Sequence, residues 1–549
     1  MKKFYFSAML LFLAISLNAQ QQYRRSVKPV KNVIVMIPDG TSTGVLSIAR
    51  WFQIYNELGG DRLNLDPYLC GMVKTYLSDA PVPDSAPAMS AYMTGVPSRR
   101  GRISTYPNPR PGQDIYPVDS AMAYQPLVTV LEAAKIEKKK STGLVVTVPF
   151  CHATPAACAS HHYDRGKYEY LAPQIAYNNV DVVFGGGAAN ITDDIVKQLS
   201  RNNTDYIEND INAFRSYEGD KNLWALFAKG NFPYDLDTDF GAVPSLAEMT
   251  EKALSRLSKD PDGFFLMVEG SRVDMAAHAM DPIGIITEFL AFDKAVGIAL
   301  DFAKWNGETA VVILPDHGNS GINFGSREMD NYSSRGLDDV FAAVSKYKKT
   351  AKGLERILLK TKPEDIRTVF KEYTNIDLTD DELKLLFSSK NYEVADYTEV
   401  GSSVNMVSSI AKIMTSRTYF DFISGNHTGE DVFLAAYHPD GDIPMGLNTN
   451  IEINQYLCDI VGLQSTLAEH TGQLFAKHTD VFAGYNYSIG TSGDETVLTV
   501  KKGKKTLTIP AFKSVAYLDG KPFDLDIATV YIDRNNTFYL PKELAFKLK

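Results

Sequence analysis

Six of the nine histidines in the sequence lie in short segments that also carry carboxylates or hydroxyl groups. In one of these segments Asp274 and His278 are four residues apart, and in another Asp316 and His317 are adjacent. If residues 274–278 are helical, both side chains lie on one face and can bind the same metal ion. The alternative for that spacing is an ordinary pair on the surface of a helix.

Four other residues could supply further metal ligands. Asp39 follows an apolar run, and its two carboxylate oxygens could bridge two cations, while Glu269 ends another apolar run. His427 offers an imidazole shortly before a third run. Thr154 offers a hydroxyl group to a hard cation, although it could equally be a solvated surface residue.

Ser85 is the candidate nucleophile because it begins a stretch with helical character. Pro87 is tolerated in the first turn of a helix, and Gly95 closes the stretch. The free N–H groups at a helix start would hold a phosphate over the serine oxygen. A plain helix-capping serine has the same local sequence. Arg165 offers a planar fork that matches two phosphoryl oxygens, or it could be a solvated surface residue.

Short apolar runs rich in Val and Ile predict the strands that position these groups. Such runs suit strands buried on both faces, and helical patterns at 249–257 and 285–305 lie between them. This alternation predicts an α/β fold with a large, mostly parallel central sheet flanked by helices on both faces. Ligands bind beyond the carboxyl ends of such strands, and several candidate residues follow the runs within a few positions. The runs are 33–37, 144–148, 182–184, 264–268 and 310–314, and the residues are Asp39, His152, Glu269, Asp316 and His317.

Three further segments differ from this pattern. Residues 1–19 combine two lysines, an apolar stretch and a small-residue exit, which is typical of a signal peptide. Lys- and Glu-rich helical segments predict an insertion at 325–424. Short alternating strands after residue 485 predict a small C-terminal β module at 485–549, of unknown role. We expect an exported protein, periplasmic or extracellular, without integral membrane association.

The composition is that of a globular protein, with 44% hydrophobic and 22% charged residues. The formal net charge of −10 disfavours nucleic-acid partners, although a local metal charge could still attract phosphate. The four cysteines show no CxxC spacing. Core packing is the simplest interpretation of them, and no disulfide can be assigned.

Six motifs in this order resemble the alkaline phosphatase family over residues 31–483, which we therefore expect to form the catalytic domain. They are PDG at 38–40, DSA at 84–86, HATPAA at 152–157 with Arg165 after it, VEGxxxDxxxH at 268–278, PDHG at 315–318, and HTGED at 427–431.

The resemblance implies two zinc ions and one magnesium ion. Asp274, His278 and His427 would hold the first zinc. Asp39, Asp316 and His317 would hold the second, and Asp39, Thr154 and Glu269 would hold the magnesium. Ser85 would then be the nucleophile that forms a phosphoserine, with Arg165 gripping the phosphoryl group. The implied substrates are small phosphate monoesters, and the implied assembly is a homodimer.

The sequence departs from the family pattern in places. His152, beside the predicted magnesium ligands, stands where bacterial members often carry Asp. Met275 and Asn319 replace residues that often lie near the phosphate or the metals. The identity of the third metal therefore stays open. Two other functions also stay open: hydrolysis of phosphodiesters, phosphonates or sulfate esters, and non-catalytic scavenging of metal or phosphate.

Overall fold

The computed structural model describes residues 27–326, 329–389, 405–493 and 495–548. The predicted signal peptide at 1–19 and residues 390–404 of the predicted insertion lie outside the described residues. Within the described residues, no helix has both the length and the apolar character needed to cross a membrane.

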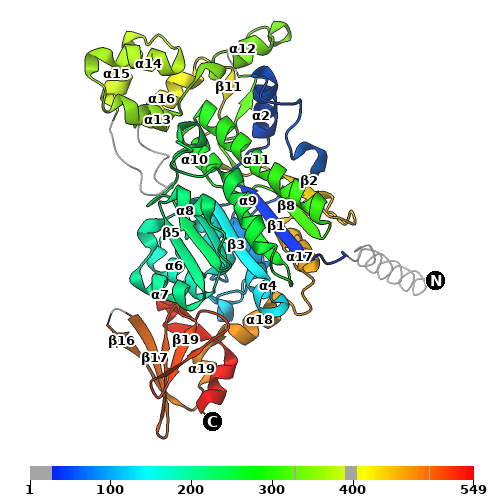
Figure 1. Ribbon diagram of the computed structural model, residues 1–549, viewed down its shortest axis with the longest axis vertical. Helices are drawn as coiled ribbons and strands as arrows, with labels where there is room; N and C mark the ends of the chain where they lie inside the picture. The colour runs from blue at the N-terminus through cyan, green and yellow to red at the C-terminus, as the bar shows by residue number, and fades with distance from the viewer. Residues whose placement is uncertain (1–26, 327–328, 390–404, 494, 549) are drawn as a thin grey trace, which may run out of the picture.

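A ten-stranded sheet forms the centre of the molecule (Figure 1). The strand order is β14-β2-β13-β8-β1-β7-β3-β4-β6-β5. All neighbouring pairs are parallel except those made by β13, which is antiparallel to both β8 and β2. The predicted α/β fold with a mostly parallel sheet is therefore confirmed. The strands are β1 (Asn32–Pro38), β2 (Leu69–Lys74), β3 (Ser141–Pro149), β4 (Val182–Gly186), β5 (Thr204–Glu208), β6 (Asn222–Leu226), β7 (Phe264–Gly270), β8 (Thr309–Ile313), β13 (Val432–Tyr437) and β14 (Gly446–Thr449).

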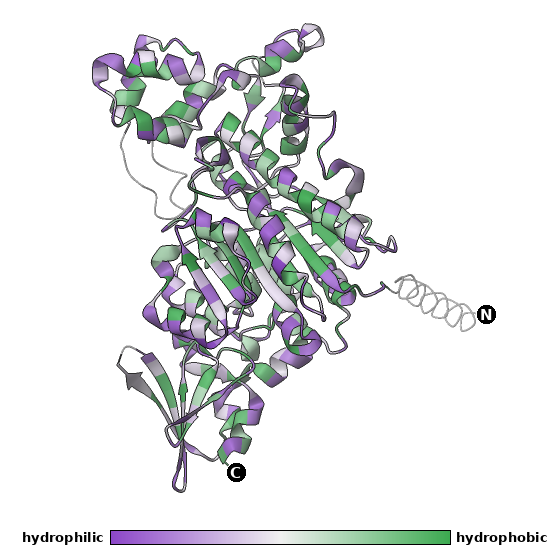
Figure 2. Cartoon of the chain, in the orientation of Figure 1, coloured by the Kyte–Doolittle hydropathy of each residue, from purple (hydrophilic) through white to green (hydrophobic). Residues whose placement is uncertain are grey.

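The two faces of this sheet pack against two separate hydrophobic cores. Along β1, Val33 and Val35 belong to one core, and Ile34 and Met36 belong to the other, as the two-residue period of a strand requires. Hydrophobic residues accordingly run along the central strands (Figure 2). One face is covered by α3 (Ser85–Thr94), α4 (Val130–Lys138), α5 (Ala153–Ala159), α6 (Tyr168–Tyr177) and α17 (Asn450–Val461), and the other by α2 (Gly44–Tyr55), α9 (Leu246–Leu257), α10 (Arg272–His278) and α11 (Pro282–Asn306).

The five predicted strands correspond to β1, β3, β4, β7 and β8. The two strands at the sheet edges, β5 and β14, carry polar residues at several positions, so they lack the continuous apolar run of a buried strand. All four cysteines are free, and Cys151 and Cys158 are buried.

Two smaller parts lie at opposite ends of the molecule (Figure 1). Between the short paired strands β10 (Asn323–Phe324) and β11 (Phe420–Asp421), the chain forms helices that pack into the second core. At the other end, β16 to β20 form a five-stranded antiparallel sheet beside the three-stranded sheet β15-β22-β21. The helices are α12 (Leu337–Phe341), α13 (Ala351–Leu358), α14 (Ile366–Thr374), α15 (Asp380–Ser388) and α16 (Met406–Thr415). The strands are β15 (Ala476–Lys477), β16 (Asn486–Ser492), β17 (Glu495–Lys502), β18 (Lys505–Pro510), β19 (Val515–Leu518), β20 (Lys521–Asp524), β21 (Val530–Ile532) and β22 (Thr537–Leu540).

The C-terminal strands are fixed to the large domain by buried hydrogen bonds. Ser514 Oγ donates to the backbone oxygen of Tyr177 at 2.6 Å, and the Ala528 N–H donates to Asn178 Oδ1 at 2.7 Å. Phe512 stacks on Tyr170, with 4.8 Å between ring centroids. These contacts fix the position of the C-terminal part on the surface of the large domain.

Glu288 on α11 is a buried carboxyl group whose ionisation the fold opposes. Burial raises its pKa to about 8, although the charge of Arg272 acts in the opposite direction. The ordinary pKa of glutamate, 4.5, applies in the unfolded chain. The folded state therefore binds this proton more tightly, so stability falls as the pH rises from about 4.5 to about 8.

Replacing Glu288 by glutamine removes this loss. We expect Glu288→Gln to raise the free energy of unfolding by about 1–3 kcal/mol at pH 8.5 and by much less at pH 5. Urea unfolding of both proteins with a chelator present measures this, and the exposed Glu251→Gln variant on α9 is the control. An equal effect at both pH values would contradict the assignment.

Candidate metal centre and nucleophile

Neighbouring parallel strands bring most of the candidate residues to one edge of the sheet. The strands β8, β1, β7 and β3 are consecutive in the sheet and all parallel, so their carboxyl ends meet. Asp39 follows β1 directly, and Glu269 is the penultimate residue of β7. Asp316 and His317 follow β8, and His152 precedes α5 shortly after β3.

His427 reaches this edge through a two-residue ladder. Strand β12 (His427–Thr428) pairs antiparallel with β9 (Gly318–Asn319), and His427 lies opposite Asn319. In the sequence, the helical insertion lies between these two short strands. The ladder therefore places His427 next to the segment that carries Asp316 and His317.

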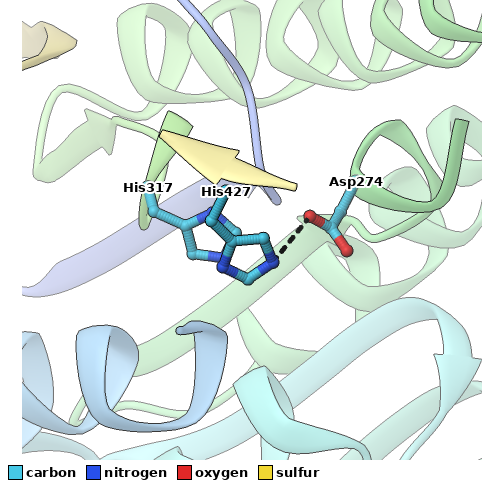
Figure 3. Close-up of side chains that lie close together, drawn as sticks. All are labelled: Asp274, His317 and His427. Carbon is cyan, nitrogen blue, oxygen red and sulfur yellow. Dashed lines mark ion pairs between the residues drawn. The ribbon is translucent and has the colours of Figure 1, made fainter. Parts of the chain in front are cut away.

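Asp274, His278 and His427 form the first group of potential metal ligands. The Nε2 atoms of His278 and His427 are 3.1 Å apart. His278 Nε2 lies 3.4 Å from Asp274 Oδ2, and His427 Nε2 lies 3.6 Å from Asp274 Oδ1. Figure 3 shows the His427 ring facing the Asp274 carboxylate, with the His317 ring stacked against it at 3.8 Å between centroids. Residues 272–278 are indeed helical, and Asp274 and His278 are buried, so the alternative of a surface pair is wrong.

Backbone carbonyl groups orient all three histidine rings. The Nδ1 atom of His278 lies 2.9 Å from the Gly425 oxygen, and that of His427 lies 2.8 Å from the Pro83 oxygen. His317 Nδ1 lies 3.1 Å from the Gly318 oxygen. A carbonyl oxygen only accepts, so each Nδ1 carries a proton and Nε2 is the ring nitrogen that can be left bare. This is the tautomer that binds a metal ion.

Asp39, Asp316 and His317 form the second group. His317 Nε2 lies 3.5 Å from both Asp39 Oδ1 and Asp316 Oδ2. One ligand atom from each of the three residues lies within 4.8 Å of the others, and all three side chains are buried. The group is therefore compact enough to bind one ion.

A third group has oxygen ligands only. Thr154 Oγ1 and both carboxylate oxygens of Glu269 are buried, and within residues 27–326, 329–389, 405–493 and 495–548 they have no hydrogen-bond partner. Native proteins rarely leave buried polar atoms unpaired, and an ion is one of the partners that satisfies them. A hydroxyl group and carboxylates suit a hard cation such as Mg²⁺. These residues therefore fit the predicted magnesium site.

Burying four carboxyl groups together perturbs their ionisation. Burial, together with the charges of neighbouring carboxylates, raises the pKa of Asp39 well above its ordinary value. Burial likewise raises the pKa of Glu269 to about 8 and that of Asp316 to about 7. Burial acts in the same direction on Asp274, but the three nearby histidines outweigh it and lower the pKa of that carboxyl group. Bound cations would offset this crowding of negative charge.

Ser85 lies beside the second group. It is the first residue of α3, while Asp84 is the residue that caps this helix, so Ser85 is not a plain capping serine. Ser85 Oγ donates to Asp39 Oδ1 at 3.3 Å and lies 3.1 Å from His317 Nε2. Its side chain is buried within the site, where the helix start supplies free N–H groups for an anion.

Arg165 is held close to Ser85 by two partners. Its Nη1 atom donates to Asp84 Oδ1 at 2.7 Å. Its Nη2 atom lies 3.3 Å from His152 Nε2. Burial, and then the charge of Arg165, lowers the pKa of His152 to about 3, so this ring is neutral and accepts the bond. The guanidinium is thus oriented before any substrate binds.

Two residues that support the site were not predicted as such. Asn319 Nδ2 donates to Asp274 Oδ1 at 2.7 Å, so the residue that departs from the family pattern fixes a carboxylate of the first group. Gly40 has a φ of +56°, and a Cβ atom at this position would lie 2.1 Å from Asp274 Oδ1. Only glycine allows the Asp39 segment to pass so close to Asp274. The PDG motif contains Gly40, but the sequence does not show that Gly40 lies against Asp274.

Comparisons with known proteins agree with the motifs. A family model described as alkaline phosphatase matches residues 30–463. Alkaline phosphatase 3 of Bacillus subtilis (strain 168) is 31% identical over 453 residues, which cover 79% of this chain and 90% of that protein. The crystal structure of a cold-active alkaline phosphatase from Shewanella sp. is similar with a TM-score of 0.67 at 25% identity, covering 79% of this chain and 100% of that one. Thermus thermophilus alkaline phosphatase has the same fold, with a TM-score of 0.69 at 22% identity over 81% of this chain and 94% of that one.

The bond from Asn319 to Asp274 leads to a prediction about metal affinity. We expect Asn319→Ala to weaken binding of the zinc ion predicted at the first group about 10- to 100-fold, because the carboxylate of Asp274 loses the partner that orients it. Calorimetric titration of chelator-stripped protein with zinc measures the change. The exposed Asn212→Ala variant is the control. Unchanged zinc affinity would show that Asp274 needs no support from Asn319.

Proposed function

The chain belongs to the alkaline phosphatase family and is a metal-dependent phosphoric monoester hydrolase, and we propose that it acts through a phosphoserine formed on Ser85. The observation that carries this proposal is the position of Ser85 Oγ, 3.3 Å from Asp39 Oδ1 and 3.1 Å from His317 Nε2 at the start of α3. A nucleophile at this position would meet the phosphorus of a monoester bound against the three ligand groups.

The three ligand groups would hold two zinc ions and one magnesium ion. Asp274, His278 and His427 suit a zinc ion because they combine two imidazoles with a carboxylate. Asp39, Asp316 and His317 suit a second zinc ion. Asp39, Thr154 and Glu269 offer only oxygen and suit Mg²⁺. Bound cations would lower the pKa of the serine hydroxyl and neutralise negative charge that develops during phosphoryl transfer.

The side chains of the protein then carry out two displacements. Ser85 Oγ loses its proton to solvent and attacks phosphorus, the new O–P bond forms, and the bond to the alcohol oxygen breaks, so that the alcohol leaves after taking up a proton from solvent. Water then attacks the phosphoserine, which releases inorganic phosphate and restores the serine. In both steps the Arg165 guanidinium would bind two non-bridging oxygens. Asp84 and His152 hold that guanidinium in place.

Arg165 also distinguishes between possible ester substrates. A fork that binds two non-bridging oxygens suits a monoester dianion, whereas a diester carries a single negative charge over these oxygens. The geometry therefore favours monoesters over diesters and sulfate esters. A scavenger without turnover would have no need of a serine hydroxyl beside Asp39 and His317.

The N-terminal pattern at 1–19 supports export. Edman sequencing of the secreted protein should begin shortly after Ala19, and an intact Met1 would contradict this. Homodimer formation rests on the family resemblance alone. Light scattering should give about twice the mass of the mature chain.

Removing the nucleophile tests the proposed mechanism. We expect Ser85→Ala to lower kcat for an aryl phosphate monoester by at least about 10³-fold, because the covalent route is lost. The exposed Ser255→Ala variant should keep wild-type activity. Retained activity in Ser85→Ala would contradict the role of Ser85, and acid-stable phosphoserine in the wild type alone would support it.

Removing the guanidinium tests the substrate preference. We expect Arg165→Ala to lower kcat/KM for an aryl monoester by about 10²-fold or more, and to change the slower hydrolysis of the matching methyl aryl diester far less. The exposed Arg62→Ala variant controls for the loss of one positive charge. Equal losses on both esters would show that Arg165 does not select for the dianion.

A further inference from the structure

A basic pocket of about 430 Å³ lies next to the proposed active site. Five arginines line it, together with a single lining carboxylate, Asp164. Two of the arginines are paired: Arg99 forms ion pairs with Asp79 and Asp114, and Arg110 forms one with Asp79. The five arginines still outnumber these carboxylates and Asp164, so the pocket is positive although the chain as a whole has a formal charge of −10. The arginines are Arg99, Arg100, Arg102, Arg110 and Arg534.

Three of these guanidinium groups have no carboxylate within ion-pair distance among the described residues. They are Arg100 and Arg534, which are exposed, and Arg102, which is only 5% exposed. Arg102 Nη2 donates to Asn108 Oδ1, and the guanidinium also hydrogen-bonds Tyr124, but Nη1 is buried and has no hydrogen-bond partner in the part of the chain that the structure describes. An uncompensated buried charge is strongly unfavourable, and an anionic ligand would relieve it. The unpaired N–H group of Arg102 is therefore the strongest sign that the pocket binds an anion.

Aromatic rings hold two of the guanidinium groups in position. The Arg102 guanidinium lies over the Tyr124 ring, 4.5 Å from its centroid, and that of Arg534 lies 4.4 Å from the centroid of Tyr163. Both groups also hydrogen-bond tyrosine hydroxyls, Arg102 that of Tyr124 and Arg534 those of Tyr124 and Tyr163. A guanidinium has five N–H donors, so those that remain can bind the oxygen atoms of a ligand. Burial would raise the pKa of Tyr124, yet hydrogen bonds from Arg534 and Arg102, followed by the charges of these two groups, lower it.

The C-terminal part of the chain supplies Arg534. This residue lies in a short turn (Asp533–Asn535) between β21 and β22, beyond the residues 30–463 that the family model matches. The buried hydrogen bonds of Ser514 and Ala528 to the large domain fix this part of the chain. The pocket is thus completed by the β module, which contributes no other residue to its lining.

Hydrogen bonds connect the wall of the pocket to Ser85 and Arg165. The Gly101 N–H donates to Asp84 Oδ2 at 2.8 Å, and the Gly101 oxygen accepts from the Arg165 N–H at 2.8 Å. Asp84 precedes Ser85, and Asp164 precedes Arg165. A ligand in the pocket would therefore lie close to a phosphoryl group bound at Ser85.

We propose that this pocket binds a second phosphoryl group of the substrate, so that the enzyme prefers small organic bisphosphates and polyphosphorylated monoesters to simple monoesters. The inference rests on the proposed function, because the first phosphoryl group must occupy the site at Ser85. Phosphoryl oxygens fit the pocket because guanidinium groups bind them through paired N–H bonds. The second phosphate is covalently linked to the reacting phosphate, so its bonds in the pocket would help to hold the whole substrate. The KM for such substrates would therefore be lower.

Matched substrates test the inference. Bisphosphates of 1,2-ethanediol, 1,4-butanediol and 1,6-hexanediol are compared with the corresponding alkyl monophosphates, on metal-loaded full-length protein. We expect kcat/KM of the wild type to be at least about tenfold higher for one or more of the bisphosphates, well above the factor of about two that two equivalent phosphates give. In Arg100→Gln/Arg534→Gln the ratio should fall towards about two, with monophosphate hydrolysis retained. Arg62→Gln/Lys504→Gln, which removes two exposed charges elsewhere, should behave like the wild type.

A binding measurement tests the second subsite separately from the proposed catalytic function. In the Ser85→Ala background, a bisphosphate should bind more tightly than its monophosphate, and the double substitution at Arg100 and Arg534 should abolish the difference. The double variant could hydrolyse monophosphates normally and show the same ratio of bisphosphate to monophosphate kcat/KM as the wild type. That result would overturn the second subsite and leave the proposed function standing. No turnover of any monoester would overturn the proposed function itself. Inorganic phosphate that inhibits monophosphate turnover more strongly in the wild type than in the double variant, with a bisphosphate ratio of about two in both, would show a site for free phosphate and would also overturn the inference.

Discussion

The structure depends on how four buried carboxylates share one small volume. Asp39, Glu269, Asp274 and Asp316 are each at most 4% exposed, and like charges at such distances repel strongly where water is excluded. Three of the four have raised pKa values as a result. Cations bound where the carboxylates meet would offset this repulsion, and the backbone carbonyl groups turn the histidine Nε2 atoms towards the same place. Metal binding would therefore stabilise this region as well as supply its chemistry.

The rest of the architecture serves to bring these groups together. Because β8, β1, β7 and β3 are parallel neighbours, their carboxyl ends lie at one edge of the sheet. Asp39, Glu269 and Asp316 therefore lie at that edge. Helix α3 adds Ser85, and the loop after it returns through Gly101 to bind Asp84 and Arg165. The same loop carries four of the five arginines of the basic pocket, so one segment connects the reacting serine to the surface that would bind the remainder of a substrate.

The sequence alone predicts those elements that are specified by neighbouring residues in the chain. Apolar runs identified β1, β3, β4, β7 and β8, and the four-residue spacing of Asp274 and His278 identified a shared helical face. It missed what depends on contacts between distant segments. The bond from Asn319 to Asp274 and the approach of Gly40 to Asp274 join segments that no periodicity connects. The basic pocket was also missed, because Arg534 is far along the chain from Arg99 to Arg102 and only the packing of the β module brings it there.

The ladder between β9 and β12 explains how a large insertion can separate neighbouring ligands. Asn319 and His427 lie opposite one another, while the helices α12 to α16 occupy the chain between them. The entropy lost on closing a loop grows only with the logarithm of its length, by about 0.6 kcal/mol for each doubling. The insertion also buries its own apolar residues, such as Leu354 and Phe370, in the second core. The length and the surface residues of this segment can therefore change during evolution, and with them the surroundings of the active site. The ladder would still hold the His427 imidazole at the first group of ligands.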